Sequence, residues 1–264
     1  MKRIYSKLIE VSEKPLKAAE IVGGKYIVGD LLGKGSYGYT YLVNDQQGNL
    51  LVLKQLRKYK MLEESGRNSF KREANILKTL NCSAFPTFYE HFEENNKQFI
   101  VMEHKKGSTF EEIIFRENIS YTESSAFNEL YHILHLVKYI HELGFIHRDL
   151  RIPNILKNDK EYFIIDFGLA RKLEDQTSLI EKKVNHLEKQ LYREIAFKSD
   201  FYALGHFLLF LLYSSFEPIS KKKRSWEEEL QLTPIAKKVL RKMLQLDEPY
   251  AEVQLLINDV KECI

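Results

Sequence analysis

The sequence predicts an α+β fold built from a small β-rich lobe and a larger, mainly helical lobe. Two observations support this prediction. Residues 25–103 alternate short apolar runs with turn residues around one helical segment, as expected of a sheet with a single helix. From residue 108 onward helical patterns dominate, and Gly144 is expected to end the first long helix. The apolar positions of that helix recur at intervals of three and four: Phe127, Leu130, Ile133, Leu134, Val137 and Ile140.

Composition and charge limit the class of protein. The 264 residues are 44% hydrophobic, enough to form a two-lobed domain over residues 25–264 behind an N-terminal extension of residues 1–24. The net charge is only +3, so no nucleic-acid partner is expected, and the basic stretch at residues 221–224 is interpreted as solvated surface. Two cysteines far apart predict neither a disulfide framework nor a zinc site. No apolar run is long enough for a membrane span, and we expect a cytoplasmic protein.

Three glycines, Gly33, Gly35 and Gly38, lie between the apolar runs 26–28 and 39–43. Glycines are common in hairpin turns, so this pattern alone is equally consistent with an ordinary turn. Its position between two strand-like runs favours a hairpin over the strand-to-helix turn of a dinucleotide site. The backbone N–H groups of such a hairpin can approach phosphates closely, because glycine has no Cβ.

Lys54 ends a strand-like run, and Glu73 lies in the helical segment that follows. Either charge alone is more often a solvated surface group. An ion pair between the two would instead hold the ammonium group of Lys54 in a fixed direction, as a phosphate-binding lysine requires. One face of the helical segment is apolar, at Phe70, Ala74, Leu77 and Leu80.

The stretch most informative about chemistry is residues 147–154, His-Arg-Asp-Leu-Arg-Ile-Pro-Asn, followed by the Asp-Phe-Gly of residues 166–168. Phosphoryl transfer needs a carboxylate at the attacking hydroxyl and oxygen ligands for Mg²⁺. Asp149 can supply the first, while Asn154 and Asp166 can supply the second. Each would be an ordinary loop residue by itself, but together they follow the glycine and lysine motifs in the order that this chemistry requires.

Over about residues 26–212 these motifs resemble those of eukaryotic-type serine/threonine protein kinases, and the chain looks like a small atypical microbial member of that superfamily. The resemblance implies the bilobal kinase fold, ATP and Mg²⁺ as cofactors, and a protein substrate. It implies that Asp149 orients or deprotonates the acceptor hydroxyl and that Arg151 neutralises the transferring phosphoryl group. The other implied roles are metal binding by Asn154 and Asp166, phosphate contacts by Gly33, Gly35, Gly38 and Lys54, and positioning of Lys54 by Glu73.

The run 99–107 resembles the strand and hinge that bind adenine in this superfamily, although any buried strand has the same pattern. The implied set combines backbone groups at the hinge, apolar contacts to the base and a hydroxyl for the ribose. Its members are Glu103 and Lys105 at the hinge, Met102, Val52 and Leu156 around the base, and Thr109 at the ribose.

The segment after Asp166 departs from the family pattern. No proline occurs between residues 154 and 217, so the usual Ala-Pro-Glu is missing, and residues 244–251 lack the arginine that normally pairs with its glutamate. Apolar residues from 180 to 195 recur at intervals of three and four and predict a helix. Ser178 and Glu181 would form a capping box at its start.

Asp200 begins an apolar helical run and is interpreted as a structural residue. By resemblance, its carboxylate would accept backbone hydrogen bonds from His147 and Arg148. Thr177 and Ser178 are candidates for a phosphate that would pair with Arg148. The helical pattern that follows them predicts that activity does not require such a phosphate.

Three functions are compatible with the sequence: an active protein kinase, a small-molecule kinase of the same superfamily and a pseudokinase that binds ATP as a scaffold. The complete motif set favours an active kinase, whereas the altered segment keeps the small-molecule alternative open. Arg151 also has a counterpart in tyrosine kinases, so it does not decide the acceptor residue. The favoured prediction is a serine/threonine protein kinase.

Overall fold

The structure, a computed structural model, describes four stretches of the chain: residues 13–35, 37–177, 187–217 and 224–264. The chain divides into two compact units, an N-terminal unit that ends at Lys105 and a C-terminal unit that begins at Lys106. The first is mainly sheet and the second mainly helix. The α+β class predicted from the sequence is therefore confirmed.

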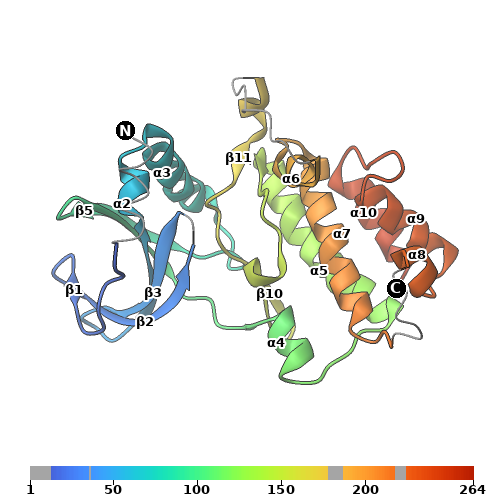
Figure 1. The fold of residues 1–264 in the computed structure, drawn as a ribbon, viewed down its shortest axis with the longest axis horizontal. Coiled ribbons are helices and arrows are strands. Elements are labelled where there is room, and N and C mark those ends of the chain that lie inside the picture. Colours follow the sequence, from blue (N-terminus) through green and yellow to red (C-terminus); the bar gives the residue numbers. More distant parts are fainter. Residues whose placement is uncertain (1–12, 36, 178–186, 218–223) are drawn as a thin grey trace. The chain divides into compact units, whose positions relative to one another are not determined.

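The N-terminal unit is built on an antiparallel sheet whose described strands have the order β1-β2-β3-β4-β6-β5. Tyr39, Tyr41 and Val43 are fully buried, because alternate residues of a strand point to the same face. The helix α3 lies beside β5 (Figure 1). The elements are β1 (Ile21–Val22), β2 (Tyr26–Lys34), β3 (Gly38–Asn44), β4 (Leu50–Leu56), α2 (Lys58–Met61), α3 (Glu64–Thr79), β5 (Phe88–Glu94) and β6 (Lys97–Glu103).

Residues 13–24, the described part of the predicted N-terminal extension, lie in the N-terminal unit. The backbone N–H of Leu16 donates to the hydroxyl of Tyr41 at 2.9 Å. Glu13 and Arg57 form an ion pair with an Oε2–Nε distance of 3.1 Å, and both side chains are buried. The described part of the predicted extension therefore packs on the sheet.

The C-terminal unit contains a layer of helices and two small sheets. Its strands pair in the orders β10-β9-β7 and β11-β8. The described elements are β7 (Ser108–Thr109), α4 (Phe110–Phe115), α5 (Glu123–Glu142), β8 (Phe145–Ile146), η1 (Ile152–Asn154), β9 (Ile155–Asn158), β10 (Glu161–Ile164), β11 (Arg171–Lys172), η2 (Leu173–Thr177), α6 (Leu187–Arg193), α7 (Phe197–Tyr213), α8 (Trp226–Glu229), α9 (Pro234–Met243) and α10 (Val253–Lys261).

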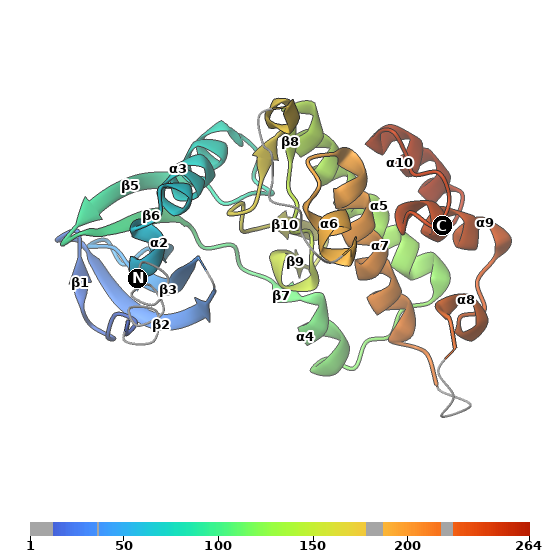
Figure 2. The same ribbon diagram turned by 45° about the horizontal axis from the view of Figure 1, so that its top comes forward.

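The helix α5 is the centre of this unit. Its predicted apolar stripe is fully buried, and α5 packs against α7 and α10 (Figure 2). Gly144, at φ +77°, lies just past its end as predicted. Gly205 lets α7 approach α9, because a Cβ there would lie 3.0 Å from the side chain of Leu244. No helix among the described residues is long and apolar enough to cross a membrane.

The segment after Asp166 contains β11, η2 and α6. The helix α6 covers Leu187–Arg193 and so confirms part of the helix predicted over residues 180–195. Its predicted start, with the capping box of Ser178 and Glu181, lies outside the described residues.

Candidate active site

The N-terminal unit brings Lys54 and Glu73 together. Lys54 lies on β4 and Glu73 on α3, and their Nζ and Oε1 atoms are 2.5 Å apart. The two side chains are only 9% and 3% exposed, so the pair is shielded from water. A buried charge is costly unless it is paired, which explains why β4 and α3 present these two residues to each other. The predicted ion pair is confirmed.

The three predicted glycines lie in the hairpin formed by β2 and β3, as the sequence indicated. A Cβ on Gly38 would lie 2.6 Å from the backbone oxygen of Gln55, so close packing of β3 against β4 requires glycine there. A Cβ on Gly33 would meet no atom within 4 Å. Packing therefore explains Gly38 but not Gly33, and the phosphate contacts of these glycines stay a prediction.

The hinge residues lie at the end of β6. Met102 is buried and faces Val52 across the β4–β6 pair. The backbone N–H of Glu103 donates to the carbonyl of Thr87 at 2.8 Å, so a contact of Glu103 with adenine would have to use its own carbonyl. Burial raises the pKa of the Glu103 carboxyl, but hydrogen bonds from Lys105 and Thr87 outweigh it and hold this pKa below its ordinary value. The Nζ of Lys105 lies 2.7 Å from Oε1 of Glu103.

Thr109 and Leu156 lie in the C-terminal unit, where β7 pairs with β9 and sets the two residues opposite each other. The Thr109 hydroxyl accepts a hydrogen bond from the N–H of Glu112 at 3.2 Å and donates to its carboxylate at 3.0 Å. Thr109 is thus the N-cap of α4 in a capping box. The predicted contact of Thr109 with a ribose would have to share this hydroxyl with the helix cap. It stays a prediction.

Asp149 lies at the centre of the candidate site in the C-terminal unit. The guanidinium of Arg151 contacts both of its oxygens, with Nε–Oδ1 at 2.7 Å and Nη2–Oδ2 at 3.1 Å. Asn154 Nδ2 donates to the backbone oxygen of Asp149 at 2.9 Å and to Oδ2 at 3.0 Å. The carboxylate is therefore held in one orientation by two neighbours from its own loop. The hydrogen bond between Asp149 and Arg151 also raises the pKa of the Arg151 guanidinium.

The predicted metal ligands fit a magnesium site. Asn154 uses its Nδ2 on Asp149, which orients the other end of the amide, Oδ1, as a ligand. The carbonyl of Asn154 accepts from the N–H of Ile165 at 2.9 Å and so ties this loop to Asp166. Among the described residues no group of three or more acidic, histidine or cysteine side chains could hold a metal by itself. Mg²⁺ usually takes one or two protein oxygens together with substrate phosphates and water, and Asn154 and Asp166 carry oxygens of this kind.

Asp166 has a left-handed backbone, φ +62°, and its Oδ1 accepts a hydrogen bond from the N–H of Gly168 at 3.0 Å. The side chain is exposed, whereas Phe167 is buried against His147 with ring centroids 4.8 Å apart. The backbone turn thus buries the phenylalanine and directs the carboxylate outward. A strained turn of this kind is typical of functional sites.

Asp200 supports the catalytic loop from the start of α7. Its oxygens accept from the backbone N–H groups of His147 at 2.9 Å and Arg148 at 2.7 Å, as predicted, and from His141 Nε2 at 2.9 Å. Burial raises the pKa of this carboxyl, but the hydrogen bonds and the nearby histidines outweigh it and lower the pKa below its ordinary value. Burial also lowers the pKa of the His147 ring below its ordinary value, although the nearby carboxylates oppose this shift.

Asp200 should therefore make the fold sensitive to acid. A carboxyl whose pKa is lower in the folded state stabilises the fold above its unfolded pKa of about 4, and this contribution is lost as the pH falls through the folded value. Asp200→Asn should cost about 3–5 kcal/mol at pH 7 and flatten the loss of stability below pH 4. Thermal melts between pH 7 and pH 3 test this, with Asp159→Asn at an exposed turn as a matched control. Equal melting profiles for Asp200→Asn and the parent would contradict the assignment.

An arginine near the end of the chain forms two local ion pairs. Arg241, on α9, contacts Asp247 with Nε–Oδ2 at 2.8 Å and Glu227 with Nη1–Oε1 at 2.6 Å. Both partners are local to the end of the C-terminal unit, in contrast to a glutamate of the activation segment.

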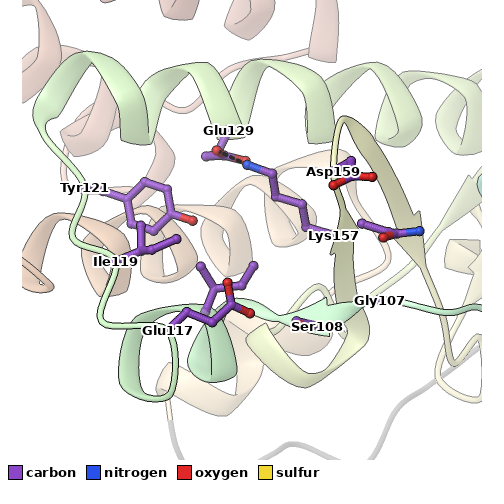
Figure 3. A pocket seen from close by; sticks show the side chains of 10 residues that line it. Gly107, Ser108, Glu117, Ile119, Tyr121, Glu129, Lys157 and Asp159 are labelled. Atoms are coloured by element: carbon purple, nitrogen blue, oxygen red, sulfur yellow. Dashed lines mark hydrogen bonds and ion pairs between the residues drawn. The ribbon is translucent and has the colours of Figure 1, made fainter.

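A hollow of about 610 Å³ opens on the C-terminal unit between β7, α4, the start of α5 and β9 (Figure 3). Lys157 and Glu129 meet there, with Nζ–Oε1 at 2.6 Å, and the hydroxyl of Tyr162 donates to the same carboxylate at 2.8 Å. The charges are thus paired with each other. None of the predicted site residues lines this hollow, so it is separate from the candidate active site.

Comparisons with known proteins show which family this chain resembles. Residues 26–260 match the model of the protein kinase domain. The chain is 33% identical over 253 residues to the "Probable serine/threonine-protein kinase YbdM" of Bacillus subtilis, covering 96% of this chain and 94% of that protein. It is 28% identical over 256 residues to "Serine/threonine-protein kinase B" of Synechocystis and 29% identical over 215 residues to "CDPK-related kinase 5" of Arabidopsis thaliana, but it covers only 44% and 36% of their lengths.

The fold and the two sets of site residues thus define a phosphotransferase of the kinase class. The chain belongs to the protein kinase domain family, which confirms the resemblance inferred from its motifs.

Proposed function

We propose that this chain is an ATP- and Mg²⁺-dependent protein kinase that transfers the γ-phosphoryl group to serine or threonine hydroxyls of a protein substrate. The observation that carries the proposal is the intact catalytic geometry around Asp149, held by Arg151 and Asn154. The buried pair of Lys54 and Glu73 supports it. The names of the bacterial relatives favour serine and threonine as acceptors.

Each residue has a defined task in this reaction. Asp149 would orient the acceptor hydroxyl and take its proton, while Arg151 keeps a positive charge beside the transferring group. Lys54 would bind phosphate oxygens, and Glu73 fixes its direction. Asn154 and Asp166 would hold Mg²⁺, which supplies charge neutralisation at the phosphates when bound. The glycines of the β2–β3 hairpin would approach the phosphates through their backbone.

The adenine contacts of Met102, Val52, Leu156 and the hinge backbone are part of the same proposal. The cytoplasmic location stays a prediction from the sequence, where the two cysteines lie far apart and no apolar run is long enough for a membrane span. The small-molecule kinase and the pseudokinase stay as outcomes of the test that follows.

The test is to incubate the chain with Mg²⁺ and radiolabelled ATP in the presence of a protein mixture and of small alcohols. We expect label on protein serine and threonine, and no transfer when Mg²⁺ is chelated. Label only on small alcohols would favour a small-molecule kinase. Binding of Mg·ATP without any transfer would favour a pseudokinase, and label only on tyrosine would correct the acceptor.

The same assay includes variants of the buried pair. Lys54→Met should lower transfer by about 10²- to 10³-fold, because it removes a preorganised charge from the phosphates. This variant leaves Glu73 buried without its partner, so a stability loss is also expected. Lys54→Met/Glu73→Gln should recover stability but not transfer. Lys71→Met, at an exposed position of the helix α3 that also carries Glu73, is the matched control. Full activity of Lys54→Met would refute the assignment.

A further inference from the structure

Two arginines join the end of α6 to the catalytic loop. Arg148 Nε donates to the backbone carbonyl of Arg193 at 2.7 Å, and its Nη2 contacts the same oxygen. In return, Arg193 Nη1 donates to the backbone carbonyl of Arg148 at 3.2 Å. Each guanidinium therefore binds the backbone of the other residue, although the two are 45 positions apart in the sequence.

This reciprocal pair holds a strained turn. Arg148 has φ +65°, a left-handed conformation that a branched or long side chain adopts only when its surroundings impose it. Three groups of Arg148 are bound: its N–H by Asp200 at 2.7 Å, its carbonyl by the Arg193 guanidinium, and its own guanidinium by the carbonyls of Arg193 and, at 3.4 Å, Leu169. Arg193 thus binds two of these three groups.

The turn matters because the next residue is Asp149. Arg193 Nη2 lies 3.8 Å from Oδ1 of Asp149, so Arg193 is a second cation near this carboxylate beside Arg151. The positive charge of Arg193 and its hydrogen bond to the Arg148 carbonyl thus both act on the loop that carries Asp149. A change at Arg193 should therefore alter the position of Asp149 without touching the nucleotide residues of the N-terminal unit.

The position of Arg193 is itself fixed by packing. Its neighbour Tyr192 contacts the ring of Tyr202 on α7 edge-on, with centroids 4.9 Å apart, and lies 5.5 Å from the ring of His206. The end of α6 also presents backbone carbonyls that lack a partner within the helix, and these suit a guanidinium. The packing of α6 on α7 thus holds the Arg193 carbonyl, which accepts from Arg148, in place.

We infer that Arg193 is a positioning residue for phosphoryl transfer: it fixes the turn at Arg148 and the carboxylate of Asp149, and it does so without a phosphate on the preceding segment. The inference rests on the proposed kinase function. The guanidinium of Arg148 already donates to the carbonyls of Arg193 and Leu169, so we expect no phosphate on Thr177 or Ser178 to be needed to hold it. The catalytic loop is consequently ordered by the helix α6.

The first experiment compares Arg193→Gln and Arg193→Lys with the parent in steady-state transfer and in Mg·ATP binding by calorimetry. Arg193→Gln should lower kcat by roughly 10- to 100-fold, as expected for loss of a charge-assisted hydrogen bond, with the Kd for Mg·ATP within about threefold. Arg193→Lys keeps the charge and should recover part of kcat. Lys198→Gln, which removes a nearby cation whose Nζ lies 3.1 Å from Oε2 of Glu194, should behave like the parent.

A second readout does not depend on transfer. Hydrogen exchange of the amides at residues 147–149 should accelerate in Arg193→Gln and stay at the parent rate in Lys198→Gln. If the parent transfers no phosphate, the proposed function fails, while faster exchange in Arg193→Gln would still support the link. Unchanged exchange in a folded Arg193→Gln, or an unchanged kcat, would overturn the inference.

The third arm treats the parent with phosphatase and compares it with Thr177→Ala/Ser178→Gly, in which glycine keeps most of the capping preference predicted for Ser178. Both should retain the turnover of the untreated parent. Collapse of the turnover in both would overturn the inference in favour of a phosphate that orders the catalytic loop through Arg148.

Discussion

Asp166→Asn is expected to abolish measurable phosphoryl transfer, a loss of at least about 10³-fold, and to weaken Mg²⁺-dependent nucleotide binding. The exposed carboxylate of Asp166 is directed outward by its left-handed backbone, and asparagine would keep that conformation while removing the charge. A neutral amide is a poor ligand for a hard divalent cation. Both the binding and the rate should therefore fall together.

The matched control for this variant is Asp159→Asn. Asp159 also has a positive φ, of +51°, and lies in the turn between β9 and β10 of the same unit. Its replacement should leave binding and turnover unchanged. Calorimetric titration of ATP with and without Mg²⁺, beside the transfer assay, measures both effects. Turnover of Asp166→Asn at the parent rate would remove Asp166 from the metal site.

Asp149→Asn should separate rate from binding. We expect turnover to fall by about 10²- to 10⁴-fold, the range for loss of a general base, while the affinity for Mg·ATP changes by no more than a few-fold. Asparagine keeps the shape of the side chain but cannot take a proton. The substitution also removes the ion pair with Arg151, whose Nε lies 2.7 Å from Oδ1 of Asp149 in the parent chain.

Single-turnover transfer and nucleotide titration give the two quantities independently. Arg151, the ion-pair partner of Asp149, provides the control. Arg151→Lys keeps a cation near Asp149 and should retain far more activity than Asp149→Asn. Strong loss of nucleotide affinity in Asp149→Asn would show that the carboxylate acts on the nucleotide, which contradicts its role at the acceptor hydroxyl.

The sequence alone determined the family, the fold class and the residues of the site that are close in the chain. Asp149, Arg151 and Asn154 contact one another within a single loop, so their spacing defines their geometry. The buried stripe of α5 followed from its helical periodicity, because one face of a helix must face the core. The pair of Lys54 and Glu73 was predictable because the motif order placed a strand and a helix in succession.

Only the tertiary structure decided the contacts between distant residues. Nothing in the sequence indicated that Arg148 and Arg193 bind each other's backbone, or that Glu13 pairs with Arg57. Arginines and glutamates are common on surfaces, and neither their spacing nor their periodicity encodes a partner far away in the chain. Such pairs form where packing of helices and strands brings polar groups out of water, and the cost of leaving a buried polar group unbound then selects the partner.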